Sequence, residues 1–251
     1  MIKLSCLQQL HLKCNLIGDV GARVLGLHLA KLTSITLLDL SNNQIGSIGA
    51  EWLGRHLAYL TCIQQLDLSK NHIGDSGAKS LGPNLAHLTS IQQLRLSCNG
   101  IGAEGSKALA PYLTNLASIQ QLDLNGNKLG DIGVQWLGPR LASLTSIQQV
   151  FLSANRIGDL GAESLGPRIA HLTFIKQLRL DVNTIGDHGA KSLGPHLAHL
   201  TSIEQLDIGY NRISADGAKS LLSDLVLLTS LEWNAAVESL RSRDARFSRS
   251  F

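Results

Sequence analysis

The chain has 251 residues, of which 44% are hydrophobic and 16% are charged, and its formal net charge is +3 at pH 7. This much apolar material excludes disorder for most of the chain, and so small a charge argues against nucleic acid or an anionic membrane as partner. No run approaches the roughly 18 apolar residues that a membrane-spanning helix needs, and the first residues lack the anatomy of a signal peptide.

A 28-residue unit, plainest at residues 63–90, is repeated without insertion, and its copies start at residues 7, 35, 63, 91, 119, 147, 175 and 203. We divide the chain into eight repeats over residues 1–230, with 1–6 as the tail of a preceding repeat. Residues 231–240 are predicted to form a degenerate C-terminal capping repeat or helix, and 241–251 a basic flexible tail. Such repetition predicts a solenoid that grows one unit at a time.

Neither the start nor the first repeat shows the polar cover that the end of a solenoid normally needs. A fragment of a longer protein is therefore one interpretation of this sequence. The open edge carries apolar Ile2 and Leu4, which predicts either a monomer or weak end-to-end association.

Each copy opens with the pattern apolar-x-x-Leu-x-Leu-x-x-Asn-x-Ile, as in LQQLHLKCNLI and IEQLDIGYNRI. The Leu-x-Leu part alternates with period two, which predicts a short strand with one buried face. An amide among apolar positions costs about 1–3 kcal/mol unless it is hydrogen-bonded. We therefore predict a ladder of stacked amides bonded to turn backbone, formed by Asn15, Asn43, Asn71, Asn99, Asn127, Asn155, Asn183 and Asn211.

A helix follows each asparagine, with the pattern Ile-Gly-Asp-x-Gly-Ala-x-x-Leu. The first glycine, as at Gly18, Gly46 and Gly74, permits a turn with positive φ. The acid after it is expected to cap its own helix, at Asp19, Asp75, Asp131, Asp159 and Asp187. Ser47 takes this place in the second copy, and the acid moves one residue on in the fourth and eighth, to Glu104 and Asp216.

Inside the helix, apolar residues recur as an inward stripe, as at Ala78, Leu81, Leu85 and Leu88. All five prolines share one repeat position: Pro83, Pro111, Pro139, Pro167 and Pro195. Because proline is accepted at the start of a helix and disfavoured inside one, we expect the helix to end before it and a kinked or separate turn to follow.

The eight units resemble the leucine-rich repeat, and the helix length and 28-residue period resemble its ribonuclease-inhibitor-type subclass. The resemblance implies an α/β fold, a right-handed solenoid or horseshoe with a parallel sheet on its concave face and helices on its convex face. The subclass occurs in cytosolic inhibitors, in the sensor regions of nucleotide-binding leucine-rich-repeat receptors and in the Ran GTPase-activating protein.

Catalytic and metal-binding motifs are missing, with no P-loop, His-Glu-x-x-His, Cys-x-x-Cys or Gly-x-Ser-x-Gly. We therefore predict neither enzyme activity nor a cofactor. Histidines recur on the helices, but copies roughly 8–10 Å apart are too far for one ion, and His196 with His199 lacks a third ligand, so no metal is predicted. The cysteines Cys6, Cys14, Cys62 and Cys98 lie too far apart in the repeat to pair, which favours a reducing, cytoplasmic location.

Comparison of the copies locates the candidate site. Framework residues barely change, whereas variation gathers between the two strand leucines and on either side of the asparagine, positions that strand alternation places on the concave face and its rim. We predict contact with a partner by His11, Asp39, Asp67, Lys70, Arg95, Asp123, Phe151, Arg156, Arg179, Asp207, Tyr210 and Arg212. Phe151 and Arg179 would be cation–π neighbours. Neutral drift of an exposed surface is the alternative explanation of the variation.

These observations predict a non-catalytic protein–protein interaction module without nucleic-acid or membrane partners. Alternatives are a ligand-sensing or autoinhibitory segment of an intracellular immune-type receptor, or an effector of an intracellular microbe. A GTPase-activating protein of the Ran-activator type is disfavoured, because the resemblance implies an acidic tail and this tail is basic. A designed repeat is disfavoured by the irregular cysteines and the decaying last copy.

Overall fold

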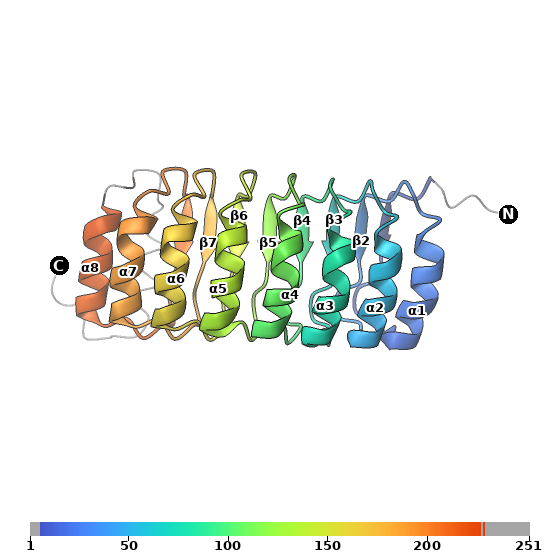
Figure 1. Ribbon diagram of the computed structural model, residues 1–251, viewed down its shortest axis with the longest axis horizontal. Helices are drawn as coiled ribbons and strands as arrows, with labels where there is room; N and C mark the ends of the chain where they lie inside the picture. Colours follow the sequence, from blue (N-terminus) through green and yellow to red (C-terminus); the bar gives the residue numbers. More distant parts are fainter. Residues whose placement is uncertain (1–5, 227, 229–251) are drawn as a thin grey trace.

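The computed structural model describes residues 6–226 and 228, and there each repeat is a short strand followed by a helix (Figure 1). The strands are β1 (Gln9–His11), β2 (Leu37–Asp39), β3 (Gln65–Asp67), β4 (Gln93–Arg95), β5 (Gln121–Asp123), β6 (Gln149–Phe151), β7 (Gln177–Arg179) and β8 (Gln205–Asp207). The helices are α1 (Gly18–Leu29), α2 (Ser47–Leu57), α3 (Gly74–Leu85), α4 (Ala103–Leu113), α5 (Gly130–Leu141), α6 (Asp159–Ile169), α7 (Asp187–Leu197) and α8 (Ala215–Leu225).

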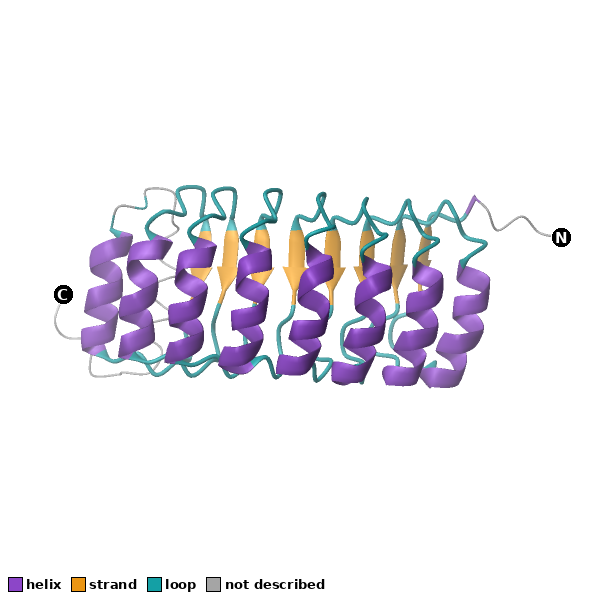
Figure 2. Ribbon diagram, viewed as in Figure 1, coloured by secondary structure: helices purple, strands orange, loops and turns teal. Residues whose placement is uncertain are grey.

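The eight described strands form one parallel sheet in sequence order from β1 to β8, so no connection crosses another. Successive strands pair 28 residues apart, as Leu38 does with Leu66. The helices all lie on one side of the sheet and are more widely spaced than the strands (Figure 2). Packed helices need more room than paired strands, so the sheet takes the inner, concave side. The predicted α/β solenoid is confirmed.

The core is one continuous layer between sheet and helices. In the third repeat Leu66 and Leu68 point into it from the strand, and the predicted stripe of Ala78, Leu81 and Leu85 enters it from α3, all at most 2% exposed. Leu88, the last member of the stripe, is equally buried but lies in the turn after the helix. Each repeat thus buries its apolar face only by stacking on its neighbours.

The predicted asparagine ladder is confirmed, and each amide from the second repeat to the eighth joins two repeats. The Nδ2 of Asn127 donates to the carbonyls of Leu96 (3.0 Å) and Leu124 (2.9 Å), and its Oδ1 accepts from the backbone N–H groups of Asn99 and Ile101 (3.0 Å each). Asn15, in the first repeat, is exposed and bonds only carbonyls of its own turn. The ladder therefore replaces the water that an edge of backbone polar groups would otherwise require.

The expectation that each acid caps its own helix is wrong, because the acid caps the next helix. Asp75 Oδ1 accepts from the N–H groups of Gly102 (2.6 Å) and Gly105 (3.0 Å), at the start of α4. Asp75 is the second residue of α3, beyond the N-cap position, whereas the stacked turn of the following repeat lies within its reach. The same bond to the following repeat is made by Asp19, Asp131, Asp159 and Asp187.

The glycine before each helix takes one of two conformations, so the expectation of positive φ holds only in part. Gly18, Gly74 and Gly130 have φ of +56°, +60° and +60°, whereas Gly46 is extended with φ of −90°. The described repeats explain the difference. The N–H of Gly46 donates to the carboxylate of the preceding repeat. The repeats before Gly74 and Gly130 have Ser47 and Ala103 at the position of that acid, so these two glycines have no such carboxylate.

The expected helix break at the prolines is also wrong. Pro83 lies inside α3, which runs unbroken to Leu85, and the four other prolines lie inside their helices in the same way. Pro83 is the third residue from the end, so it removes a single backbone hydrogen bond. Burial of Leu81 and Leu85 on either side holds the last turn in helical form.

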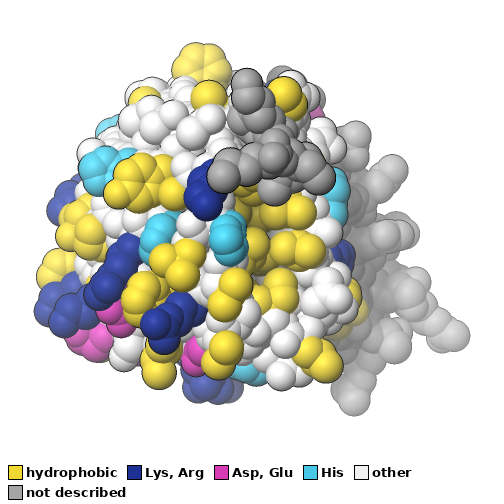
Figure 3. All heavy atoms as spheres, turned by 90° about the vertical axis from the view of Figure 1, so that its right-hand side faces the viewer, with side chains coloured by type: hydrophobic (Ala, Val, Ile, Leu, Met, Phe, Trp, Pro, Cys, Tyr) yellow, Lys and Arg dark blue, Asp and Glu magenta, His cyan; other side chains and the backbone are white. Residues whose placement is uncertain are grey.

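The end face of the first repeat is apolar, and Leu16 and Val20 there are 82% and 80% exposed. Figure 3 looks onto this end and shows apolar side chains gathered there. Residues 1–5, 227 and 229–251 are not described, so Ile2, Leu4, the predicted capping repeat and the predicted basic tail lie outside the described residues. Among the described helices, none has the length and hydropathy to span a membrane.

Candidate binding surface

The last residue of every strand contributes to one row across the concave face. Strand pairing places the eight side chains in register, in the order His11, Asp39, Asp67, Arg95, Asp123, Phe151, Arg179 and Asp207. These are the between-leucine residues singled out in the sequence, and the structure brings all of them together. Most are half-buried within the row, so they form a continuous floor rather than isolated projections.

The aspartates of this floor have a local structural task as well. The Oδ1 of Asp67 accepts the backbone N–H of Ser69 at 2.9 Å, two residues further along. Asp39, Asp123 and Asp207 make the same bond. One carboxylate oxygen thus caps the turn that follows the strand, as in Asx turns.

Arg95 is held in place on the floor by its neighbours. Its Nη2 donates to the Oε1 atoms of Gln93 (2.9 Å) and Gln121 (3.1 Å), and its Nη1 lies 3.8 Å from Asp67 Oδ2. These glutamines belong to a second row, formed by the first residue of nearly every strand. Sequence reasoning missed this row because it searched for variation between copies. Strand alternation, which gives both ends of a three-residue strand the same face, was the signal that could have found it.

The predicted contact between Phe151 and Arg179 is confirmed, since the guanidinium carbon lies 5.0 Å from the ring centroid. The phenyl ring is only 9% exposed, which corrects its interpretation as an open contact. Arg179 forms its cover, and the Nε of this arginine is buried without a hydrogen-bond partner among the described residues. Arg179 is therefore the more exposed member of this pair, and the ring lies beneath it.

Burial acts on two floor carboxyls. It raises the pKa of Asp123, against the opposing effects of the Asn125 N–H, the Ser97 hydroxyl and the charge of Arg95. Burial also raises the pKa of Asp207, against the Gly209 N–H. Both carboxyls thus lie in surroundings that disfavour their charged form, a condition common at functional sites.

The residues on either side of each ladder asparagine form the rim of the concave face, and those predicted as contacts are all exposed: Lys70, Arg156, Tyr210 and Arg212. The residue before the asparagine has positive φ in every repeat, for example +54° at Lys70 and +50° at Tyr210. This conformation restricts the variation that the sequence shows there, because few residue types adopt it readily.

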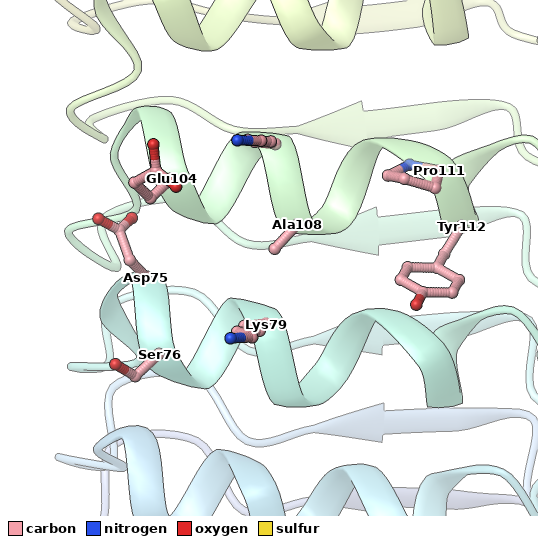
Figure 4. Close-up of a pocket in the computed structure, with 8 residues that line it drawn as sticks. Asp75, Ser76, Lys79, Glu104, Ala108, Pro111 and Tyr112 are labelled. Carbon is pink, nitrogen blue, oxygen red and sulfur yellow. The ribbon is translucent and has the colours of Figure 1, made fainter.

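A wide groove also lies on the convex face, between α3 and α4 (Figure 4). Asp75 and Glu104 stand at one end, Pro111 and Tyr112 at the other, with Lys79 between. Its charges are mixed in sign, and Asp75 is already bonded to backbone. No group of three or more His, Cys, Asp or Glu among the described residues is placed to hold a metal ion. The groove therefore offers no chemistry that singles it out.

The comparisons with known proteins agree with this architecture. Residues 3–26, 31–54, 59–82, 87–110, 115–138, 171–194 and 199–222 match the family model described as Leucine Rich repeat. The unmatched copy is the one with Val150 in place of the central strand leucine. A comparison with curated protein sequences found no significant match.

Two solved structures share the fold. Internalin C2 from Listeria monocytogenes superposes with a TM-score of 0.63 at 25% identity, over 91% of this chain and 80% of that protein. The Arabidopsis receptor kinase HAESA, solved with the peptide hormone IDA and the co-receptor SERK1, gives a TM-score of 0.51 at 17% identity. That match covers 82% of this chain and 34% of HAESA, and it speaks for the fold alone.

Proposed function

Because the chain belongs to the leucine-rich repeat family, we propose that it is a non-catalytic interaction module whose concave face binds a protein partner. The observation that carries the proposal is the floor itself, where varied side chains stand in register on an otherwise uniform scaffold. Arg95 and Arg179 are already fixed by their neighbours, so little side-chain entropy is lost when a partner binds.

The centre of the contact is proposed to lie over β6 to β8. Arg179 there carries a buried Nε with an unused donor, and Tyr210, on the adjacent rim, is 57% exposed. Arginine and tyrosine are the residue types most often found at interface hot spots. A ligand-sensing or autoinhibitory role within a larger receptor remains the alternative form of the same activity.

We also propose a cytoplasmic location and membership of the ribonuclease-inhibitor-type subclass. All four cysteines are free and exposed, which is the usual state of thiols in a reducing compartment. Each described repeat carries a helix of 11 or 12 residues, as that subclass implies. Localisation of the tagged protein in its host tests the first proposal, and recovery in an oxidising compartment would contradict it.

The test of the function is capture of a partner from the native host by the full chain and by R179A/Y210A. We expect the double variant to lose at least tenfold in partner recovery, since truncation at a hot spot costs about 2 kcal/mol or more. Phe151 is left intact, because its truncation would open a cavity in a buried site.

The matched control is R140A/Y59A, which removes the same residue types from exposed positions on the helix side. Both variants should keep the far-UV circular dichroism and the urea midpoint of the parent. Equal recovery by R179A/Y210A and R140A/Y59A would show that the concave face is not the binding surface.

A further inference from the structure

The rim of the concave face differs in charge from its floor. The sixteen rim positions, one before and one after each ladder asparagine, hold no Asp or Glu. They do hold five exposed basic side chains, those of Lys70, His72, Lys128, Arg156 and Arg212. None of these five joins an ion pair among the described residues.

Three of the basic residues line one hollow, which spans the rim from Asn42 in the second repeat to Lys128 in the fifth and has a volume of roughly 620 Å³. Lys70 and His72 line one side and Lys128 the other, and no acidic residue lines it. Two glycines keep it open. Neither Gly100 nor Gly126 places a side chain in it, and a Cβ at Gly126 would lie 2.7 Å from Cys98 Sγ.

The nearest acids along the chain do not neutralise this hollow. Asp75 and Asp131 follow His72 and Lys128 by three residues, but their carboxylates accept backbone N–H groups of the next helix. In the floor, one carboxylate oxygen of Asp67 accepts the Ser69 N–H and the other lies near Arg95. The lysines are left to be paired from outside the chain.

We propose that this hollow docks an acidic segment of the protein partner, an inference that rests on the proposed function. Lys70 and Lys128 stand two repeats apart, which at the strand spacing is roughly 10 Å. An extended chain advances about 3.3 Å per residue and presents every second side chain on one face, so carboxylates two or four residues apart, roughly 7 or 13 Å, come within reach of the flexible lysine side chains. A polypeptide fits better than a nucleic acid, because the phosphates of a nucleic acid would continue beyond the hollow and over the aspartates of the floor, whereas an acidic segment can be short.

The inference is tested with fluorescein-labelled decaglutamate and the full chain at an ionic strength of about 0.1 M. The variant is K70N/K128T, which introduces residues already present at the same repeat positions, as Asn42 and Thr184. We expect its affinity for the peptide to fall about fivefold or more from two lost charge contacts, and the parent's affinity to fall as salt is added.

The control is K79Q/K191Q, which has the same net charge and also borrows a residue, Gln135, from another copy. Its affinity should stay within about twofold of the parent, because both lysines lie on the helices and pair interactions beyond roughly 10 Å are screened. Equal loss in both variants, or no binding by the parent, would overturn the inference.

The inference and the proposed function fail in different ways. If K70N/K128T captures the partner as well as the parent does, the acidic segment is overturned while the proposed function stands. If R179A/Y210A and R140A/Y59A capture equally but the decaglutamate result holds, the hollow stands as an acidic-peptide site and the function proposed for the floor falls.

Discussion

At the scale of the single residue, Asp123 shows the two demands placed on the concave face. Its Oδ1 accepts the N–H of Asn125 at 2.9 Å and so finishes strand β5. Burial nevertheless raises the pKa of its carboxyl, which means that the charge itself weakens the fold at neutral pH. An amide would make the same bond without charge, so the turn after β5 does not by itself require a carboxylate.

We expect Asp123→Asn to raise the free energy of unfolding at pH 7, because the amide keeps the bond to Asn125 and is not charged. The sign follows from the raised pKa. The ionised carboxyl costs stability above its folded pKa, and this cost disappears as pH falls through that value toward the unfolded value near 3.9. The advantage of the variant in urea unfolding should therefore be constant above the folded pKa and be lost as pH falls from the folded pKa to the unfolded value.

Asp187 provides a comparison of opposite sign. The Ser214 hydroxyl and N–H lower the pKa of its carboxyl, so ionised Asp187 adds stability that is present above the unfolded pKa and is lost as pH falls through the folded pKa. Asp187→Asn should be destabilising at pH 7 and neutral in acid. If both variants shift the urea midpoint in the same direction at pH 7, burial is not the dominant effect at Asp123.

At the scale of the element, the chemistry within one repeat was predictable, whereas contacts between repeats were predictable only in part, at the asparagine ladder and at the pair of Phe151 and Arg179. A buried amide must find partners, so the role of Asn127 followed from its apolar neighbours in the sequence. The hydrogen-bond partner of Asp75 could not be predicted in this way, because the start of its own helix and the start of the next helix carry the same residues 28 positions apart. The same limit applied to Phe151, whose burial depends on Arg179 in the following strand.

The starts of the helices give a rule that a substitution can test. Helices that follow an acid at the repeat position of Asp75 start from an extended residue, whereas α3 and α5 follow Ser47 and Ala103 and start with glycines of positive φ. We expect Ala103→Asp to provide the missing carboxylate for α5 and to stabilise the chain by roughly 0.5–1 kcal/mol, measured by urea unfolding.

The reverse substitution is Asp75→Ala, which leaves Gly102 and Gly105 without their acceptor and should destabilise by about 1–2 kcal/mol. Glu104→Ala is the matched control. Glu104 lies one residue after the repeat position of Asp75 and makes no hydrogen bond among the described residues, so its substitution should change the free energy of unfolding by no more than about 0.5 kcal/mol. Equal losses for Asp75→Ala and Glu104→Ala would show that charge near the helix start, rather than the bond, is what matters.

At the scale of the whole molecule, the repeats are not interchangeable, although their sequences are nearly uniform. Each described unit contacts its neighbours alone, so removal of one 28-residue unit should leave a folded solenoid. The hydrogen bond from each acid to the next helix makes the outcome depend on which unit is removed. Each junction needs either a carboxylate on the preceding side or a glycine of positive φ on the following side, and a deletion can satisfy or violate that need.

Two deletions of equal length separate these cases. Deletion of residues 63–90 joins the repeat with Ser47 to α4, which then loses the carboxylate that capped Gly102. Deletion of residues 91–118 joins the repeat with Asp75 to α5, which gains one. We expect the second chain to be more stable by about 1–2 kcal/mol, with similar helical circular dichroism, because both retain seven stacked units and the difference lies in one cap. Equal urea midpoints would mean that the cap between repeats adds nothing to stability.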